Sequence, residues 1–129
     1  FLLKAVLDSK NNLKKISKIV HPIVRTRMNK FLSKNRTKKL VVLDIPLYLE
    51  NKLNMKGDVL IFVDAKRKDI QKRLKNRKYF SEKIYKKLKS LHLPLSKKRK
   101  LSNFVIKNTF NASKIQNDVK KIKTKILKI

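Results

Sequence analysis

Apolar residues recur every three to four positions along much of the chain, which is the spacing of amphipathic helices. One apolar stripe runs through residues 11–20, where Asp8 or Ser9 is in position to cap the helix. Pro22 suits the first turn of a helix, and a second stripe follows it. The pattern therefore predicts two helices that meet at His21 and Pro22.

Three other runs are almost continuously apolar and rich in β-branched residues, which is typical of strands covered on both faces. They are residues 40–45, which end at Pro46, residues 59–64 and the shorter run 104–106. Helical patterns separate the three runs. The sequence therefore predicts an α/β fold with a parallel sheet of three visible strands.

Short helical patterns dense in lysine and arginine lie between the second and third runs. Ser81 is in position to cap one of them, and Pro94 opens a further basic stretch. The apolar positions that mark the two helices are Ile70 and Leu74 in one, and Ile84, Leu88 and Leu91 in the other. After the last strand, residues 115–129 repeat apolar positions at four-three-four-three spacing behind Asn111, which predicts a capped terminal helix packed on the sheet.

Composition limits the classes of protein that this chain fits. At 129 residues it has the size of one domain, and it has no cysteine, which excludes disulfides and cysteine-bound zinc. The apolar run 1–7 is interrupted by Lys4, no cleavage site follows, and no segment is long enough to span a bilayer. We therefore expect a cytoplasmic protein without a membrane partner.

The net charge of +29 indicates an anionic partner such as nucleic acid. However, the positive charge is spread along the whole chain, and heavy use of Lys, Asn and Ile is also what an AT-rich genome produces. We favour this second explanation. No nucleic-acid-binding motif or aromatic stacking surface is present, so we expect no specific nucleic-acid partner.

Polar side chains at strand ends are the first candidates for chemistry, because ligands of open α/β sheets bind beyond the carboxyl ends of the strands. Asp44, Pro46, Glu50 and Asp64 occupy such positions. An acid there can hold Mg²⁺ or a sugar hydroxyl, or it can cap the following turn. For Asp64 we favour the turn.

Two arginines and one histidine are further candidates. Arg73 and Arg77 lie four apart on one predicted helix, so both can face one anion, although a solvated basic face is the more ordinary explanation. His21 is followed one turn later by Arg25. A lone histidine is more often a packed or capping residue, and neither it nor His92 has partners at metal-ligand spacing.

Glycine sets a limit on the function. A phosphate-binding loop of the Walker A type needs several glycines, and this chain has one, Gly57. A site of that type is therefore absent or encoded upstream.

The order of these segments resembles the dephospho-CoA kinase family over nearly the whole chain. The matching residues are His21 to Arg25, Val41 to Leu47 with Glu50, Val63 and Asp64, Arg73 and Arg77, Pro94 and Leu95 with Lys98, and Phe104 to Ile106 with Asn108. The resemblance implies a P-loop NTPase fold that uses ATP and Mg²⁺ to phosphorylate the 3′-hydroxyl of dephospho-CoA. It also implies one partial kinase domain over residues 1–129.

Within that domain, the resemblance implies substrate-binding helices at 10–36, core strands at 40–65, a lid at 67–100, and the last strand with its helix at 103–129. His21, Arg25, Asp44, Pro46 and Glu50 would then contact dephospho-CoA. Arg73 and Arg77 match lid arginines that neutralise phosphate charge, Lys98 would bind ATP, and Asn108 would adjoin the adenine.

The chain departs from the family pattern at Tyr48-Leu49, at His92 and in a lid helix that lacks an expected arginine. The larger departure is that the first strand, the Walker A loop and the early acidic base are missing. We therefore expect an N-terminally truncated kinase that is inactive alone. The alternatives are a decayed kinase kept as a regulator and a basic nucleic-acid-binding protein, and the oligomeric state stays open.

Overall fold

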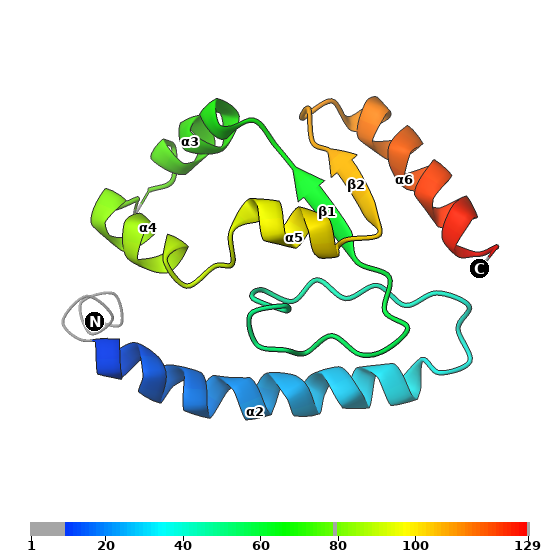
Figure 1. The fold of residues 1–129 in the computed structure, drawn as a ribbon, viewed down its shortest axis with the longest axis horizontal. Helices are drawn as coiled ribbons and strands as arrows, with labels where there is room; N and C mark the ends of the chain where they lie inside the picture. Colours follow the sequence, from blue (N-terminus) through cyan, green and yellow to red (C-terminus); the bar gives the residue numbers. More distant parts are fainter. Residues whose placement is uncertain (1–9, 79, 129) are drawn as a thin grey trace.

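The computed structural model describes residues 10–78 and 80–128, in which a long helix and an extended loop precede a parallel α/β unit (Figure 1). The predicted caps Asp8 and Ser9, and the last apolar position, Ile129, lie outside the described residues. The elements are α2 (Lys10–Lys34), β1 (Ile61–Asp64), α3 (Arg67–Lys75), α4 (Glu82–Lys89), α5 (Leu95–Leu101), β2 (Phe104–Lys107) and α6 (Ala112–Ile126).

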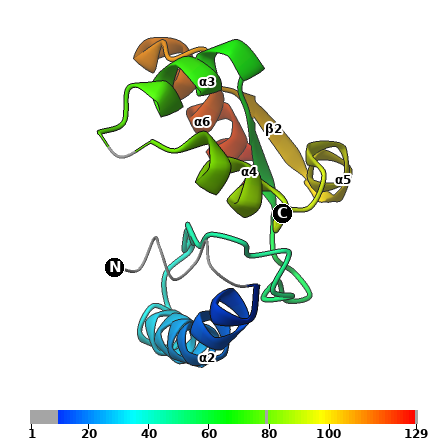
Figure 2. The ribbon, with the colours of Figure 1, turned by 90° about the vertical axis from the view of Figure 1, so that its left-hand side faces the viewer.

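Helix α2 is one continuous helix of 25 residues with Pro22 inside it, so the prediction of two helices was wrong. Proline removes one backbone hydrogen bond, at a cost of about 3 kcal/mol, but the turns on both sides keep their own bonds. Figures 1 and 2 show α2 along the bottom of the molecule, with the loop of residues 35–60 between it and the sheet.

Strands β1 and β2 pair in parallel, with Ile61 opposite Phe104 and Asp64 opposite Lys107. At the start of the pair, the Leu60 N–H donates to the side-chain oxygen of Asn103 at 2.8 Å. Two of the three predicted strands and their parallel direction are therefore confirmed.

The third predicted strand is not formed among the described residues. Residues 40–45 carry no strand assignment, and the sheet has two strands. Val41, Leu43 and Ile45 are half-buried, while Leu40 and Val42 are exposed. One face of the segment is therefore partly buried and the other is exposed, although its composition predicted burial of both faces. A strand forms when its backbone N–H and C=O groups pair with those of a neighbouring strand. Among the described residues, no strand pairs with residues 40–45.

The helices that follow the strands confirm the predicted caps. The Ser81 hydroxyl accepts from the N–H of Ile84 at 3.5 Å, and the Asn111 side chain accepts from the N–H of Lys114 at 3.1 Å. Helix α6 packs against β2, as its apolar stripe predicted (Figure 1). Among the described residues the buried apolar side chains are few, namely Met28, Leu53 and Ile106, and each keeps 6–7% of its surface exposed.

The loop between α2 and β1 is held by Tyr48. Its hydroxyl donates to Asp58 Oδ2 at 2.7 Å, and the Met55 N–H donates to the same oxygen at 2.7 Å. Burial and the adjacent Asp58 carboxylate raise the pKa of Tyr48 to about 12, because both disfavour a second negative charge. The hydrogen bonds to Asp58 therefore stabilise the loop that contains Glu50.

No helix within the described part of the chain combines the length and the apolar character needed to cross a membrane.

Candidate functional site

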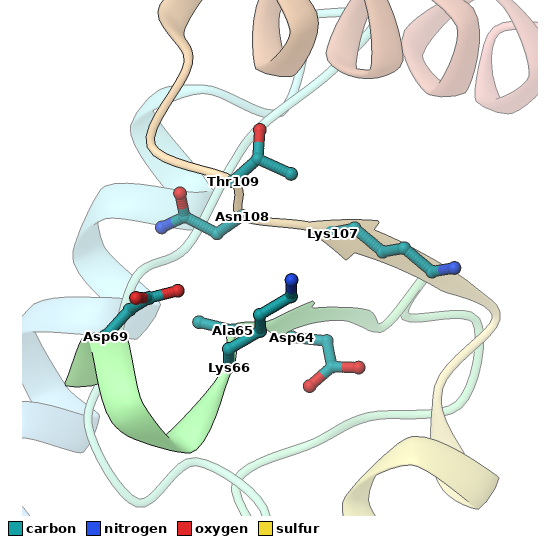
Figure 3. A pocket seen from close by; sticks show the side chains of 7 residues that line it. All are labelled: Asp64, Ala65, Lys66, Asp69, Lys107, Asn108 and Thr109. Atoms are coloured by element: carbon teal, nitrogen blue, oxygen red, sulfur yellow. The ribbon is translucent and has the colours of Figure 1, made fainter. Parts of the chain in front are cut away.

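An open pocket of about 360 Å³ lies at the carboxyl ends of β1 and β2, where ligands of α/β sheets bind. Figure 3 shows Asp69 and Asn108 on the same side of this opening, the first from α3 and the second from the loop after β2. Its lining residues are Asp64, Ala65, Lys66, Asp69, Lys107, Asn108 and Thr109. The pocket therefore combines carboxylates, lysines and one amide.

Asn108 fixes the loop that forms one wall of the pocket. Its N–H donates to the Asp64 carbonyl at 2.7 Å, which continues the strand pairing by one residue. Its side-chain oxygen accepts from the Phe110 N–H at 2.9 Å. Phe110 has a φ of 59°, a left-handed conformation that strains a bulky residue by about 1–3 kcal/mol. The predicted site residue Asn108 thus both lines the pocket and shapes its rim.

Arg73 lies in the last turn of α3, and its guanidinium carbon is 4.2 Å from the centre of the Phe110 ring. This contact is a cation–π interaction. It links the predicted phosphate-binding Arg73 to the loop of Asn108. The structure therefore brings two sequence-predicted residues from different segments to the same edge of the sheet.

Arg77 does not share a helix with Arg73, contrary to the prediction. Helix α3 ends at Lys75, and Asn76 closes it by donating its N–H to Lys72 and Leu74 carbonyls. The helix has only Ile70 and Leu74 as large apolar side chains. Tertiary packing therefore contributes little to its stability, and the helix is short. Arg77 lies in the bend that follows, and its side chain is exposed.

Glu50 joins the loop of residues 46–58 to the segment before α5. Its Oε1 accepts from Lys98 Nζ at 2.6 Å and from the Leu93 N–H at 2.9 Å, and His92 Nδ1 lies 3.6 Å away. The Glu50 side chain is 10% exposed. Burial acts to raise the pKa of Glu50, but the Lys98 ammonium and the Leu93 N–H outweigh it and lower that pKa. Glu50 is therefore a mostly buried carboxylate held in its charged form.

Asp64, at the end of β1, pairs with α5 and does not cap a turn. Its Oδ2 lies 3.4 Å from Arg99 Nη1, and among the described residues no backbone N–H donates to this carboxylate. The interpretation of Asp64 as a turn residue was wrong, because a side chain 35 positions later reaches it. Arg99 was absent from the sequence candidates, and its place in a basic stretch gave no signal that distinguished it.

The remaining candidates lie elsewhere. His21 and Arg25 are on α2, and Asp44 and Pro46 are on the extended segment that follows it. None of the four lines the pocket at the strand ends. His21 is half-buried, whereas Arg25, Asp44 and Pro46 are exposed. The structure thus separates one group of candidates near β1 and β2 from another along α2 and its loop.

No group of three or more metal-ligating side chains occurs in the part of the chain that the structure describes. Two carboxylates, Asp64 and Asp69, line the pocket. Mg²⁺ commonly binds proteins through one or two carboxylates together with water and substrate phosphates. The donors of the pocket thus fit a magnesium–nucleotide complex, although they form no cage for a bare ion.

Comparison with known proteins decides the family. Residues 1–114 match the family model for dephospho-CoA kinase. The chain belongs to the dephospho-CoA kinase family. The resemblance of the chain to this family is therefore confirmed, while the proposed lid and the roles of the individual residues stay predictions.

Similar proteins of this family come from several bacteria. A dephospho-CoA kinase of Wolbachia sp. subsp. Brugia malayi (strain TRS) is 32% identical over 123 residues, which are 94% of this chain and 63% of that protein. The dephospho-CoA kinase of Bartonella quintana (strain Toulouse) is 31% identical over 107 residues, 81% of this chain and 55% of that protein. The chain thus spans about 55–63% of the length of these dephospho-CoA kinases.

Proposed function

We propose that the product of the complete gene is a dephospho-CoA kinase, which transfers the γ-phosphoryl group of ATP to the 3′-hydroxyl of dephospho-CoA in the cytoplasm. The observation that carries the proposal is the pocket beyond β1 and β2, where Asn108 forms a wall and Arg73 contacts Phe110, two residues after Asn108. Membership of the dephospho-CoA kinase family supports it. The comparisons give no support to the nucleic-acid-binding alternative.

The pocket is the proposed site of ATP. Asn108 can present its amide to the adenine, while Arg73 and the exposed Arg77 can neutralise charge on the transferred phosphates, which is the main catalytic task in phosphoryl transfer. Mg²⁺, held mainly by the phosphates, would supply further neutralisation there. Lys98 does not line the pocket, but it can donate three hydrogen bonds, of which Glu50 and His92 occupy two, and we propose that the third serves ATP in the complete kinase.

Dephospho-CoA is the proposed ligand of α2 and the loop after it. His21 and Arg25 lie one turn apart on α2, so they can face the same anionic group. Asp44 and Pro46 lead into the turn that carries Glu50. Because Glu50 is paired with Lys98, the acceptor loop is tied to the proposed lid, residues 67–100. Glu50 thereby links the proposed binding sites of the two substrates.

The proposed P-loop fold requires more sheet than the described residues form. Val42, Ile61 and Val63 are 75%, 41% and 57% exposed, although the composition of their runs is that of covered strands. We propose that residues 40–45 form a third parallel strand in the complete sheet. The 129 residues include one glycine and no Walker A motif, so we also propose that this chain alone transfers no phosphoryl group.

Acceptor-dependent release of ADP tests the proposed function. The product of the complete gene, given ATP and Mg²⁺, should release ADP with dephospho-CoA and should not do so with an analogue that lacks the 3′-hydroxyl. Arg73→Met should lower the rate about tenfold or more, in line with the loss of a charge that stabilises the transition state. Lys121→Met removes a charge from an exposed position of α6 and should leave the rate unchanged. Equal ADP release from both acceptors would contradict the proposal.

A further inference from the structure

The loop of residues 108–111 holds an aromatic side chain in an unfavourable backbone conformation. Phe110 has a φ of 59°, which a glycine adopts freely and a bulky residue does not. The loop is fixed on both sides of it, since Asn108 bonds to Asp64 and Asn111 caps α6. Strained residues persist where the surrounding structure enforces them, and they are frequent at functional sites.

Burial does not explain why this position carries an aromatic ring. Phe110 is 38% exposed and is not part of the buried core of the described residues. What the ring contacts is the guanidinium of Arg73, at 4.2 Å from its centroid. The ring thus faces a charged group on α3, the helix that also carries the pocket residue Asp69.

Arg73 is placed beside the pocket by the geometry of α3. Asp69 lines the pocket, and Arg73 follows it by four positions on the same helix, so both lie on one face. Within residues 10–78 and 80–128, the structure gives the Arg73 guanidinium no hydrogen bond and no ion pair. Its orientation therefore depends on the ring of Phe110.

We infer that Phe110 is a positioning residue, which holds the Arg73 guanidinium at the rim of the pocket for the phosphates of a nucleotide. A cation–π contact attracts the guanidinium through its charge and forms no hydrogen bond to an acceptor, so N–H donors remain available for phosphate oxygens. The ring thus restrains a flexible side chain without using the groups that bind the ligand. The inference rests on the proposed function and adds a residue that the sequence resemblance does not include.

The affinity for ATP, measured by titration calorimetry on the product of the complete gene, tests this role. Phe110→Leu should weaken ATP binding about two- to fivefold, which is the range of a cation–π contact at an exposed site. Phe110→Tyr keeps a ring and should restore the affinity. Phe110→Gly removes both the ring and the strain, so it should weaken ATP binding without lowering the unfolding midpoint.

A double-mutant cycle shows whether Phe110 acts through Arg73. In an Arg73→Met background, Phe110→Leu should cause no further loss of ATP affinity. In kinetics, Phe110→Leu should act on the KM for ATP and leave the KM for dephospho-CoA unchanged. Independent losses in the double variant would overturn the inference, as would wild-type affinity in Phe110→Leu.

A wild-type protein that binds ATP but does not phosphorylate dephospho-CoA would refute the proposed function alone, because the affinity cycle would still decide the role of Phe110.

Discussion

Replacing Glu50 should separate the loop of residues 46–58 from the segment of residues 92–98. The Glu50 and Lys98 side chains are 10% and 20% exposed, and their charged atoms are 2.6 Å apart. Exposed ion pairs contribute about 0–1 kcal/mol, and losing one partner of a fully buried pair costs about 3–5 kcal/mol. The Glu50 pair is intermediate, and Gln retains an acceptor for the Leu93 N–H. Glu50→Gln should therefore lower the free energy of unfolding by about 2 kcal/mol.

Urea unfolding of the product of the complete gene, followed by circular dichroism, measures this loss. With a slope of about 2 kcal/mol per molar urea, the midpoint should fall by about 1 M. Glu82→Gln is the matched control, since Glu82 pairs with Lys86 at 3.3 Å but both side chains are about 70% exposed. The control should change the unfolding free energy by less than about 0.5 kcal/mol. Equal midpoints for the two variants would show that the Glu50–Lys98 pair contributes no more to stability than the exposed Glu82–Lys86 pair.

The pH dependence of stability gives an independent check on Glu50. Its pKa is lowered in the folded protein by Lys98 and the Leu93 N–H, against the effect of burial. A lowered carboxyl pKa stabilises the fold above the unfolded value of about 4.3, and this stabilisation disappears as the pH falls through the folded pKa. Below about pH 4.3 the wild-type protein should therefore lose stability more steeply than Glu50→Gln. Parallel curves of unfolding free energy against pH for the two proteins would show that the Glu50–Lys98 pair does not stabilise the fold.

Three further predictions concern the loop, the last helix and the sheet. Because the pKa of Tyr48 is raised from 10.0 to about 12, stability should fall as the pH rises through that range, and Tyr48→Phe should abolish this fall in urea titrations at successive pH values. Asn111→Ala removes the cap of α6 and should cost about 1 kcal/mol, measured as the loss of unfolding free energy in urea. Val42→Lys should destabilise the complete gene product by at least about 2 kcal/mol if residues 40–45 form a covered strand there, but should hardly affect the 129-residue chain, in which Val42 is 75% exposed.

Capping and strand signals in the sequence predicted local structure well, whereas Pro22 did not separate two helices and α3 ends before Arg77. Ser81 and Asn111 cap their helices because a cap depends only on residues three positions away. The runs at 59–64 and 104–106 lie largely within strands because their composition suits a covered sheet. The run at 40–45 has the same composition and forms no strand, because pairing requires a distant partner that composition does not specify.

Contacts between distant segments account for what the sequence could not predict. Glu50 and Lys98 were separate candidates in the sequence. They lie 48 positions apart, and only the fold shows that they form one ion pair. Phe110 was not a candidate, since neither its backbone conformation nor its contact with Arg73 is visible in the sequence. An aromatic residue between Asn108 and the helix cap Asn111 was the available signal, and it is a weak one.

The site of phosphorylation on the product tests the central proposal most directly. The product of the complete gene should be incubated with ATP, Mg²⁺ and dephospho-CoA, and the nucleotide product should be analysed by phosphorus NMR and mass spectrometry. Dephospho-CoA should gain one phosphate, located on the 3′-oxygen of the ribose, with one ADP formed per product molecule. Unchanged dephospho-CoA, or a phosphate at any other position, would contradict the proposal.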